Sequence, residues 1–245
     1  MIYAVLSDIH SNLEALQAVL KDLASEKVHS FLILGDIIGY GPNPNECIEI
    51  VKKLHGTVIA GNHEGLLRKD FAVEQYNSLA RESIRWTRKN ILHENVKFIE
   101  NLSYLKEMPN FLIVHGSPRY PEEYLFNIQE VNEAFSYFQK RYPQFYLCFF
   151  GHTHKQAIWC KQEDKVYLCQ GEDTFHLSTQ SYYLINPGSV GQPRDGSPEA
   201  NYAIYDTSTQ KLLLRKVPYN YQLTLKKILK VGLPPALGYR LGEGK

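Results

Sequence analysis

The chain has 245 residues, of which 44% are hydrophobic, so it is long enough to bury a large core. Its 27 lysine and arginine residues nearly balance its 26 aspartate and glutamate residues, and so small a net charge gives no broad field to attract an extended nucleic acid or an anionic membrane. No run of apolar residues is long enough to cross a bilayer.

The first third of the chain alternates between strand and helix patterns. Three short apolar runs bounded by polar residues or glycine are typical of buried strands, at 2–6, 31–34 and 57–60. One helix is predicted after Asn12, which can cap it, and a second from Pro44, which suits a first turn, to about Leu54. This alternation predicts a parallel sheet with right-handed crossovers.

The middle of the chain continues the alternation of strands and helices, and the last third changes to a run of short strands. Residues 64–90 are polar-rich and predicted to be helical, and a helix over 129–140 connects predicted strands at 111–114 and 145–150. Beyond residue 155, short segments rich in Tyr, Val and Leu alternate with turn residues. They predict a run of antiparallel strands at 156–161, 165–170, 174–178, 181–186, 201–207 and 211–217.

The last predicted helix spans roughly 219–231 and is amphipathic, so its lysines are expected on a solvated face. No internal repeat, low-complexity tract or linker interrupts the chain. The whole pattern predicts an α/β fold in which two mixed β-sheets pack as a sandwich flanked by helices, with one domain over residues 1–245.

Five predicted strands are followed directly by side chains that can bind metals. They are Asp8 and His10, Asp36, Asn62 and His63, His115, and His152 and His154. A single histidine beside a strand is more often structural, and a single aspartate there is usually a turn former. Ligands bind beyond the carboxyl ends of strands in an open α/β sheet, however, so five segments deliver polar groups to one edge. That convergence predicts a metal site.

The spacing and the donor types agree with this prediction. Asp8 and His10 are two residues apart, as are His152 and His154, so both members of each pair can face one way in extended backbone. Glycines that permit sharp turns and close approach precede several of these residues, at Gly35, Gly61 and Gly151. Oxygen and imidazole donors without a thiolate suit manganese, iron, zinc, cobalt or nickel better than a calcium or structural zinc site.

The order of these motifs resembles that of the calcineurin-like metallophosphoesterases. DxH, GD, GNHE, a later histidine and GHTH follow one another through most of the chain. The stretches GDIIGYGPNP, VHGSP and NPGSVGQPRDG are similar to those of a small bacterial and archaeal phosphodiesterase branch related to diadenosine tetraphosphatases. The resemblance implies the family's αββα sandwich, in agreement with the strand and helix pattern.

The resemblance also implies a role for each motif residue. Two divalent transition-metal ions are expected, with manganese as the first choice and iron, zinc, nickel or cobalt as alternatives. The first ion would be held by Asp8, His10, Asp36 and His154, and the second by Asp36, Asn62, His115 and His152. Asp36 would bridge the ions, a metal-bridging hydroxide would attack phosphorus, and His63 would face the phosphate as a catalytic residue.

Most residues around the motifs have two interpretations. Arg194 either contacts a second phosphate or is a solvated loop residue, and Asn186 is expected to support the site. Aromatic residues after the ligand positions could stack on a nucleobase, although packing is favoured; they are Tyr40, Tyr120, Tyr124 and Phe126. Glu64 either orients His63 or starts a helix, and the second role is favoured. The candidate substrate contacts are Arg194, Tyr120 and Tyr124.

These features predict a dinuclear-metal phosphohydrolase that cleaves phosphodiester or phosphoanhydride bonds of small, nucleotide-derived substrates. The alternatives are a non-catalytic metal-binding scaffold of the same fold, a phosphomonoesterase or protein phosphatase, and a nuclease. The balanced charge argues against extended nucleic acid, as do Glu122 and Glu123 if they line the entrance. The expected partner is therefore a small phosphate ester, with no extended nucleic acid and no membrane, and the oligomeric state stays open.

The cysteines and the first residues bear on location. Cys47, Cys148, Cys160 and Cys169 form no CxxC pair, so neither a zinc knuckle nor a disulfide scaffold is indicated. The first apolar run passes into Ser7-Asp8 without a basic leader or a small-residue cleavage site. We therefore expect a cytoplasmic enzyme with reduced thiols.

Overall fold

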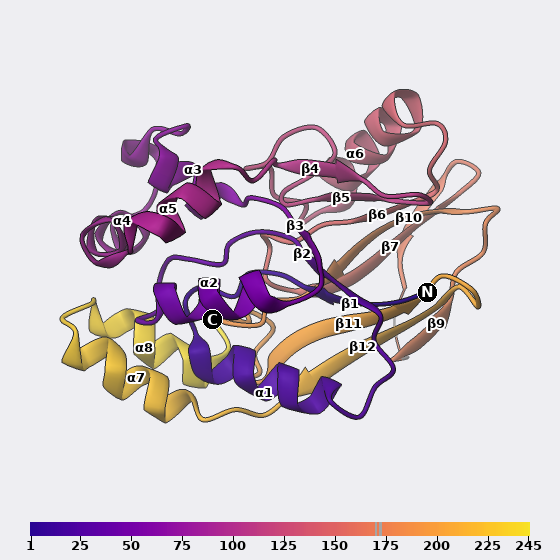
Figure 1. Cartoon of the computed structure of the whole chain (residues 1–245). Coiled ribbons are helices and arrows are strands. Elements are labelled where there is room, and N and C mark those ends of the chain that lie inside the picture. The colour runs from indigo at the N-terminus through magenta and orange to yellow at the C-terminus, as the bar shows by residue number, and fades with distance from the viewer. Residues whose placement is uncertain (170, 172) are drawn as a thin grey trace.

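Two six-stranded β-sheets pack face to face, and helices cover their outer sides (Figure 1). The structure is a computed structural model that describes residues 1–169, 171 and 173–245. Over these residues it confirms the α/β sandwich of two mixed sheets that the sequence predicts. None of the helices in them has the length and apolar character needed to span a membrane.

The first sheet begins with the three parallel strands predicted for the first third of the chain. β1 (Ile2–Leu6) lies beside β2 (Ser30–Ile33), which lies beside β3 (Gly56–Val58). The crossovers are α1 (Leu13–Leu23) and α2 (Pro44–Lys53), which begins with Pro44 in its first turn. α1 is capped by Asn12, whose Oδ1 accepts a hydrogen bond from the Ala15 N–H, as predicted.

Three late strands complete this sheet on the other side of β1. β11 (Ala200–Asp206) runs antiparallel to β1, followed by β12 (Lys211–Val217) and β9 (Thr174–His176). β1 therefore has a strand neighbour on each side and lies inside the sheet.

The second sheet has a parallel centre and antiparallel edges. β5 (Leu112–Val114), β6 (Leu147–Phe149) and β10 (Tyr182–Pro187) are parallel neighbours, and α6 (Ile128–Arg141) connects the first two. Outside them lie β7 (Gln156–Gln162), β8 (Lys165–Leu168) and β4 (Leu105–Glu107). The antiparallel pairing predicted for 181–186 is confirmed on one side of β10, where it pairs with β7, whereas on its other side β10 pairs in parallel with β6. Residue 170, at the end of the predicted strand 165–170, lies outside the described residues.

Alternation along β1 explains how the layers are held together. Tyr3 and Val5 join the apolar core between the two sheets, whereas Ala4 and Leu6 join the core under α1 and α2. Both faces of β1 are thus covered, which accounts for its uninterrupted apolar sequence. A third apolar cluster packs α6 onto the second sheet.

The segment 64–90, predicted to be helical, is two helices with a break. α3 (Asn62–Arg68) ends at Lys69, whose φ of 68° is left-handed. A 3₁₀ turn at Val73–Gln75 follows, and α4 (Ser78–Asn90) begins where Asn77 Oδ1 accepts a hydrogen bond from the Ala80 N–H. Residues 75–77 lie in this break, where Gln75 and Asn77 are exposed and Tyr76 is half-buried.

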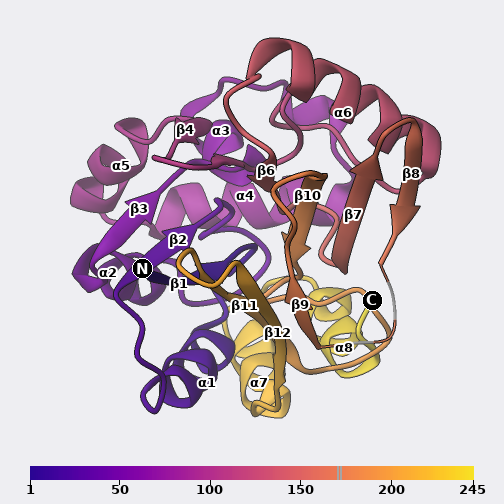
Figure 2. The same cartoon turned by 90° about the vertical axis from the view of Figure 1, so that its right-hand side faces the viewer.

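Three elements were not predicted: α5 (His93–Glu100), β4 and α8 (Pro235–Glu243). α8 follows α7 (Tyr221–Lys230), so the predicted helix 219–231 is not the last one. Pro234, Pro235 and Gly238 obscure the helical period of α8 in the sequence. α7 and α8 pack against each other, and α7 also packs against α1 (Figure 2).

Candidate metal centre

The motif side chains converge at the carboxyl ends of β1, β2, β3, β5 and β6. In chain order they are Asp8, His10, Asp36, Asn62, His63, His115, His152 and His154. Each is at most 4% exposed. A buried cluster of carboxylates and imidazoles needs compensating charge or hydrogen bonds, because burial of an unpaired polar group is costly.

The backbone at these positions differs from the sequence expectation. The DxH and HTH pairs do not lie in extended backbone, because five residues have left-handed φ values between 48° and 65°: Asp8, His10, Asp36, His152 and His154. Each left-handed residue costs on the order of 1 kcal/mol. Strained backbone of this kind is typical of functional sites and persists only when the surrounding fold holds it.

Two glycines are required by close approach of the ligand loops. A Cβ on Gly61 would lie 2.2 Å from Asp36 Oδ1, and a Cβ on Gly151 would lie 2.8 Å from Asp8 Oδ2. A side chain at either position would displace a carboxylate of the cluster. The close approach predicted at these glycines is confirmed.

Backbone carbonyls orient three of the histidines. Nδ1 of each ring donates a hydrogen bond to a carbonyl oxygen: His10 to Ile38 at 3.1 Å, His115 to Leu34 at 2.7 Å, and His154 to Gln192 at 2.6 Å. A carbonyl can only accept, so Nδ1 carries the hydrogen and Nε2 of each ring faces the cluster, where it has a free lone pair whenever the ring is neutral. Histidines that bind metals are commonly held in this way.

The first group of metal-binding donors consists of Asp8, His10, Asp36 and His154. His10 Nε2 and His154 Nε2 are 3.1 Å apart, and Asp8 Oδ1 lies 3.2 Å from His154 Nε2. Asp36 Oδ2 lies 3.6 Å from His10 Nε2. The four side chains offer donor atoms that all lie within 4.8 Å of one another.

Asp36 belongs to a second group as well. Its Oδ2 lies 3.3 Å from His115 Nε2, and the donors of Asp36, His115 and His152 lie within 4.8 Å of one another. Asn62 Oδ1 is 3.0 Å from His115 Nε2 and adds an amide oxygen. One oxygen of Asp36 thus faces both groups, while its Oδ1 accepts a hydrogen bond from the His63 backbone N–H at 2.8 Å.

Burial and neighbouring charges set the pKa values in the cluster. Burial lowers the pKa of His10 well below its ordinary value and also lowers the pKa of His154. Burial and the charge of His115 lower the pKa of His152 to about 3. Burial would lower the pKa of His115 too, but the Asp36 carboxylate outweighs it and raises that pKa to about 10. His10 and His154 are therefore neutral near pH 7.

Bound cations would account for two features of the cluster. Neutral His10 and His154 direct lone pairs at each other across 3.1 Å, an arrangement that is repulsive without a positive charge between them. Asp8 Oδ1 and His152 Nε2 are buried without hydrogen-bond partners in the described part of the chain. Two ligands that each lie about 2.1 Å from one ion are roughly 3–3.5 Å apart. The residues therefore fit divalent ions that take oxygen and imidazole ligands.

His63 lies in the cluster without joining either group. Its ring packs against His10 and Tyr40, with centroid distances of 4.9 Å and 4.5 Å. Its Nδ1 is buried and has no hydrogen-bond partner among the described residues. Gly39 leaves the necessary space, since a Cβ there would lie 2.1 Å from His63 Nδ1. Burial lowers the pKa of His63 to about 4, although the Asp36 carboxylate opposes the change.

Glu64 lies in the first turn of α3, in agreement with the favoured helix-start role, and also holds the neighbouring loop. Its carboxylate accepts hydrogen bonds from the backbone N–H groups of Gly61, Asp36 and Ile38 at 2.7, 2.7 and 3.1 Å. These bonds tie the loop after β2 to the start of α3. The hydrogen bonds described for Glu64 do not involve the His63 side chain.

Asn186 holds the loop that carries His152 and His154. Its Nδ2 donates to the Gly151 carbonyl oxygen at 2.7 Å and to Thr153 Oγ1 at 2.9 Å. It therefore lies next to the cluster as a supporting residue, as the sequence analysis expected.

Arg194 and Tyr124, two of the predicted substrate contacts, lie beside the cluster. The Arg194 backbone N–H donates to the His154 carbonyl oxygen at 3.1 Å, and its guanidinium donates to Gln192 Oε1 at 3.0 Å. The Tyr124 ring stacks on His152, with centroids 3.9 Å apart and an interplanar angle of 25°. Both residues therefore lie next to the cluster, and their contact with a substrate stays a prediction.

Tyr120, the third predicted substrate contact, does not line the cavity beside the cluster. It is 65% exposed and lines a separate surface cavity with Arg119 and Tyr137. Tyr40, in contrast, is buried against His10 and His63, in agreement with the packing interpretation.

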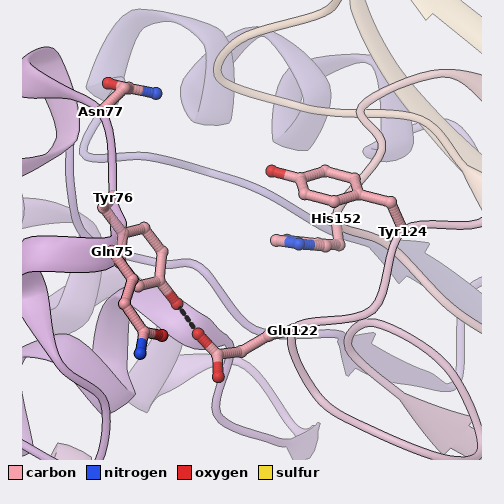
Figure 3. Close-up of a pocket in the computed structure, with 6 residues that line it drawn as sticks. All are labelled: Gln75, Tyr76, Asn77, Glu122, Tyr124 and His152. Carbon is pink, nitrogen blue, oxygen red and sulfur yellow. Dashed lines mark hydrogen bonds between the residues drawn. The ribbon is translucent and has the colours of Figure 1, made fainter.

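A cavity of about 360 Å³ opens beside the second group (Figure 3). It is lined by Gln75, Tyr76, Asn77, Glu122, Tyr124 and His152. Glu122 lies in its wall, as the sequence analysis anticipated, whereas Glu123 pairs with Arg119. Residues 75–77 were missed because the sequence pattern assigned them to a continuous helix.

Arg240 is another residue that the sequence analysis missed. Burial and the charge of Arg194 lower its pKa, and Tyr40 and Tyr124 oppose the change. It lies on α8, and a hydrogen bond of 3.1 Å from the Gly196 N–H to the Gly244 carbonyl oxygen joins that helix end to the loop after Arg194. Two arginines thus approach the site from segments far apart in the sequence.

Known proteins resemble this chain along its whole length. Residues 1–210 match the model of the calcineurin-like phosphoesterase superfamily domain. An uncharacterized protein of Methanocaldococcus jannaschii is 40% identical over 249 residues, which cover 99% of this chain and 98% of that protein. A metallophosphoesterase structure from Sphaerobacter thermophilus is 34% identical, with a TM-score of 0.84 over 100% of both chains. A hypothetical protein from Pyrococcus horikoshii shares the fold at 20% identity, with a TM-score of 0.80 over 100% of this chain and 98% of the other.

Proposed function

Because this chain belongs to the calcineurin-like phosphoesterase superfamily and is a metal-dependent phosphoesterase, we propose that it hydrolyses phosphodiester or phosphoanhydride bonds of small, nucleotide-derived substrates at two divalent metal ions. The observation that carries the proposal is the position of Asp36 Oδ2, 3.6 Å from His10 Nε2 in one donor group and 3.3 Å from His115 Nε2 in the other. The first ion is assigned to Asp8, His10, Asp36 and His154, and the second to Asp36, Asn62, His115 and His152.

Manganese is the proposed metal, with iron, zinc, nickel and cobalt as alternatives, because the donors are carboxylate, amide and imidazole groups. When bound, the two ions would acidify the water that attacks phosphorus and neutralise charge on the phosphoryl oxygens. The chain itself sets where these donors lie. Carbonyl partners orient the imidazoles, and hydrogen bonds to Glu64 hold the loop that presents Asp36.

His63 is proposed to act on the phosphoryl group rather than on a metal. Its pKa of about 4 makes the imidazole neutral near pH 7 before substrate arrives. A phosphate anion alongside favours the protonated form, because opposite charges stabilise each other in a buried site. His63 can then donate a hydrogen bond to a phosphoryl oxygen or a proton to the leaving oxygen.

The surroundings of the cluster support a small substrate. The cavity of about 360 Å³ is near the lower end of the range for ligand pockets, about 300–1,000 Å³. Glu122 in its wall disfavours an extended polyanion, whereas the guanidinium of Arg194 can bind a further phosphate. A small phosphate ester is therefore the proposed partner rather than a nucleic acid or a membrane. The free cysteines, three of them buried, support a proposed cytoplasmic location.

A comparison of specificity constants tests this function. Purified protein loaded with manganese would be assayed on bis-p-nitrophenyl phosphate, p-nitrophenyl phosphate, a dinucleoside polyphosphate and a phosphopeptide. We expect the diester or the anhydride to have the highest kcat/KM. The proposal is wrong if the monoester or the phosphopeptide has a kcat/KM about tenfold higher than the diester and the anhydride. The enzyme is then a phosphomonoesterase or protein phosphatase.

A further inference from the structure

The walls of the cavity beside His152 are polar but almost uncharged (Figure 3). The lining consists of two amides, two phenols, one carboxylate and one imidazole: Gln75, Asn77, Tyr76, Tyr124, Glu122 and His152. Neither lysine nor arginine is among these six residues, and Glu122 is the one carboxylate of the lining. The lining is therefore rich in hydrogen-bonding groups and slightly negative.

Two classes of ligand are disfavoured by this lining. A second phosphate would face the Glu122 carboxylate without a cation in the wall to offset the repulsion. A flat ring is less favoured at Tyr124, because this phenol already stacks on His152 at a centroid distance of 3.9 Å and on Phe126 at 5.0 Å. Both neighbours are nearly parallel to it, at 25° and 11°, so stacking within the protein already occupies part of this ring.

The remaining hydrogen-bonding groups suit neutral hydroxyls. Glu122 Oε1 accepts a hydrogen bond from the Tyr76 hydroxyl, which leaves other carboxylate lone pairs for a ligand. Asn77 Oδ1 caps α4, so its amide Nδ2 stays available as a donor. A carboxylate that accepts from sugar hydroxyls is a well-known recognition device, as in dinucleotide-binding folds.

The cavity adjoins the second donor group. His152 lines the cavity and also belongs to the group of Asp36 and His115. A ligand in the cavity therefore lies next to any phosphate bound at the metal centre.

We propose that this cavity binds a hydroxyl-bearing alcohol of the substrate, such as ribose or glycerol, and that Glu122 recognises its hydroxyls. The inference rests on the proposed phosphodiesterase function, because the alcohol must be esterified to the phosphate at the metal centre. It makes Glu122 a specificity-determining residue. Diesters that carry free neighbouring hydroxyls are then preferred over diesters of a plain alkyl alcohol.

Three p-nitrophenyl diesters test the proposal, because they share one leaving group and differ in the second alcohol. The second alcohol is ethanol, glycerol or the 5′-hydroxyl of uridine, and the assay uses the full chain loaded with manganese. We expect kcat/KM for the glyceryl or uridine diester to exceed that for the ethyl diester by about tenfold or more, the scale of a hydrogen bond to a charged group. The better of the two hydroxylated diesters distinguishes glycerol from ribose.

Variants then connect the preference to the cavity. Glu122→Gln keeps the size of the side chain and removes the charge, so the ratio of the hydroxylated to the ethyl diester should fall several-fold. Gln75→Ala, at an exposed position of the same wall, should also lower the ratio and does not disturb the Tyr76–Glu122 bond. Glu94→Gln, an exposed position on α5, is the matched control and should keep the ratio of the unmodified chain.

The possible failures are distinguishable. A ratio of about one in the unmodified chain, or a ratio unchanged in both Glu122→Gln and Gln75→Ala, overturns the role of the cavity while leaving diester hydrolysis intact. If none of the three diesters is hydrolysed, the proposed phosphodiesterase function is itself wrong, and the inference falls with it.

Discussion

Replacing Asp36 by alanine should remove both proposed metal ions rather than one. Asp36 Oδ2 lies 3.6 Å from His10 Nε2 and 3.3 Å from His115 Nε2, and among the described residues Asp36 alone belongs to both donor groups. Asp8→Ala, in contrast, deletes a donor from the first group only. The two variants therefore separate a bridging ligand from an ordinary one.

The size of the effect follows from the linkage between binding and folding. An ion present at about 100 times its Kd stabilises the folded chain by about 2.7 kcal/mol. For a chain of about this length, 1 kcal/mol moves Tm by roughly 2–4 °C. Each ion should therefore raise Tm by roughly 5–10 °C. The unmodified chain should gain twice that amount from two ions, Asp8→Ala about half of the full gain, and Asp36→Ala almost none.

Thermal scans with manganese and with a chelator measure this gain within each variant. The comparison cancels any effect of the substitution on the metal-free protein, such as the loss of the 2.8 Å bond from the His63 backbone N–H to Asp36. Elemental analysis counts the ions directly. Asp164→Ala, in an exposed turn between β7 and β8, is the control and should keep the full gain. Two ions still bound to Asp36→Ala, or full activity of the chelated unmodified chain, would refute the bridging role.

Three further substitutions probe the surroundings of the centre. His63→Ala should keep its metals and lose turnover by about 100-fold on substrates with poor leaving groups, but less on p-nitrophenyl esters, which need no proton; equal losses on both would exclude His63 as the acid. Arg194→Ala should raise KM about tenfold for a dinucleoside polyphosphate, and an unchanged KM would remove Arg194 from the substrate site. Asn186→Ala should lower the free energy of unfolding in urea by about 2–3 kcal/mol, because it leaves the buried Gly151 carbonyl without its 2.7 Å bond; a loss near zero would contradict that account.

The cluster could be predicted because its determinants are local in the sequence. Each motif residue follows a short apolar run, and such runs form β1, β2, β3, β5 and β6. Parallel strands in a sheet end at a common edge, so the side chains that follow them converge without knowledge of any contact. The cap of α1 by Asn12 and the proline at the start of α2 are equally local signals.

Other features depended on distant segments and stayed hidden until the chain was folded. The spacing of Asp8 and His10 predicts extended backbone, but their φ values are left-handed because hydrogen bonds to the loop after β2 hold them there. The bond between Tyr76 and Glu122 joins residues 46 apart, and Arg240 approaches Arg194 through a helix that prolines and a glycine conceal.

By itself the sequence determined the sandwich, the edge of the sheet that carries the site, and the residue types gathered there. Periodicity and strand ends are short-range properties, and they decide which side chains can face a metal. Only the tertiary structure decided which carbonyl orients each imidazole, which oxygen of Asp36 faces both donor groups, and which neutral and charged groups surround the substrate. Those choices arise from packing between segments far apart in the chain, and the spacing of residues along the sequence carries no record of them.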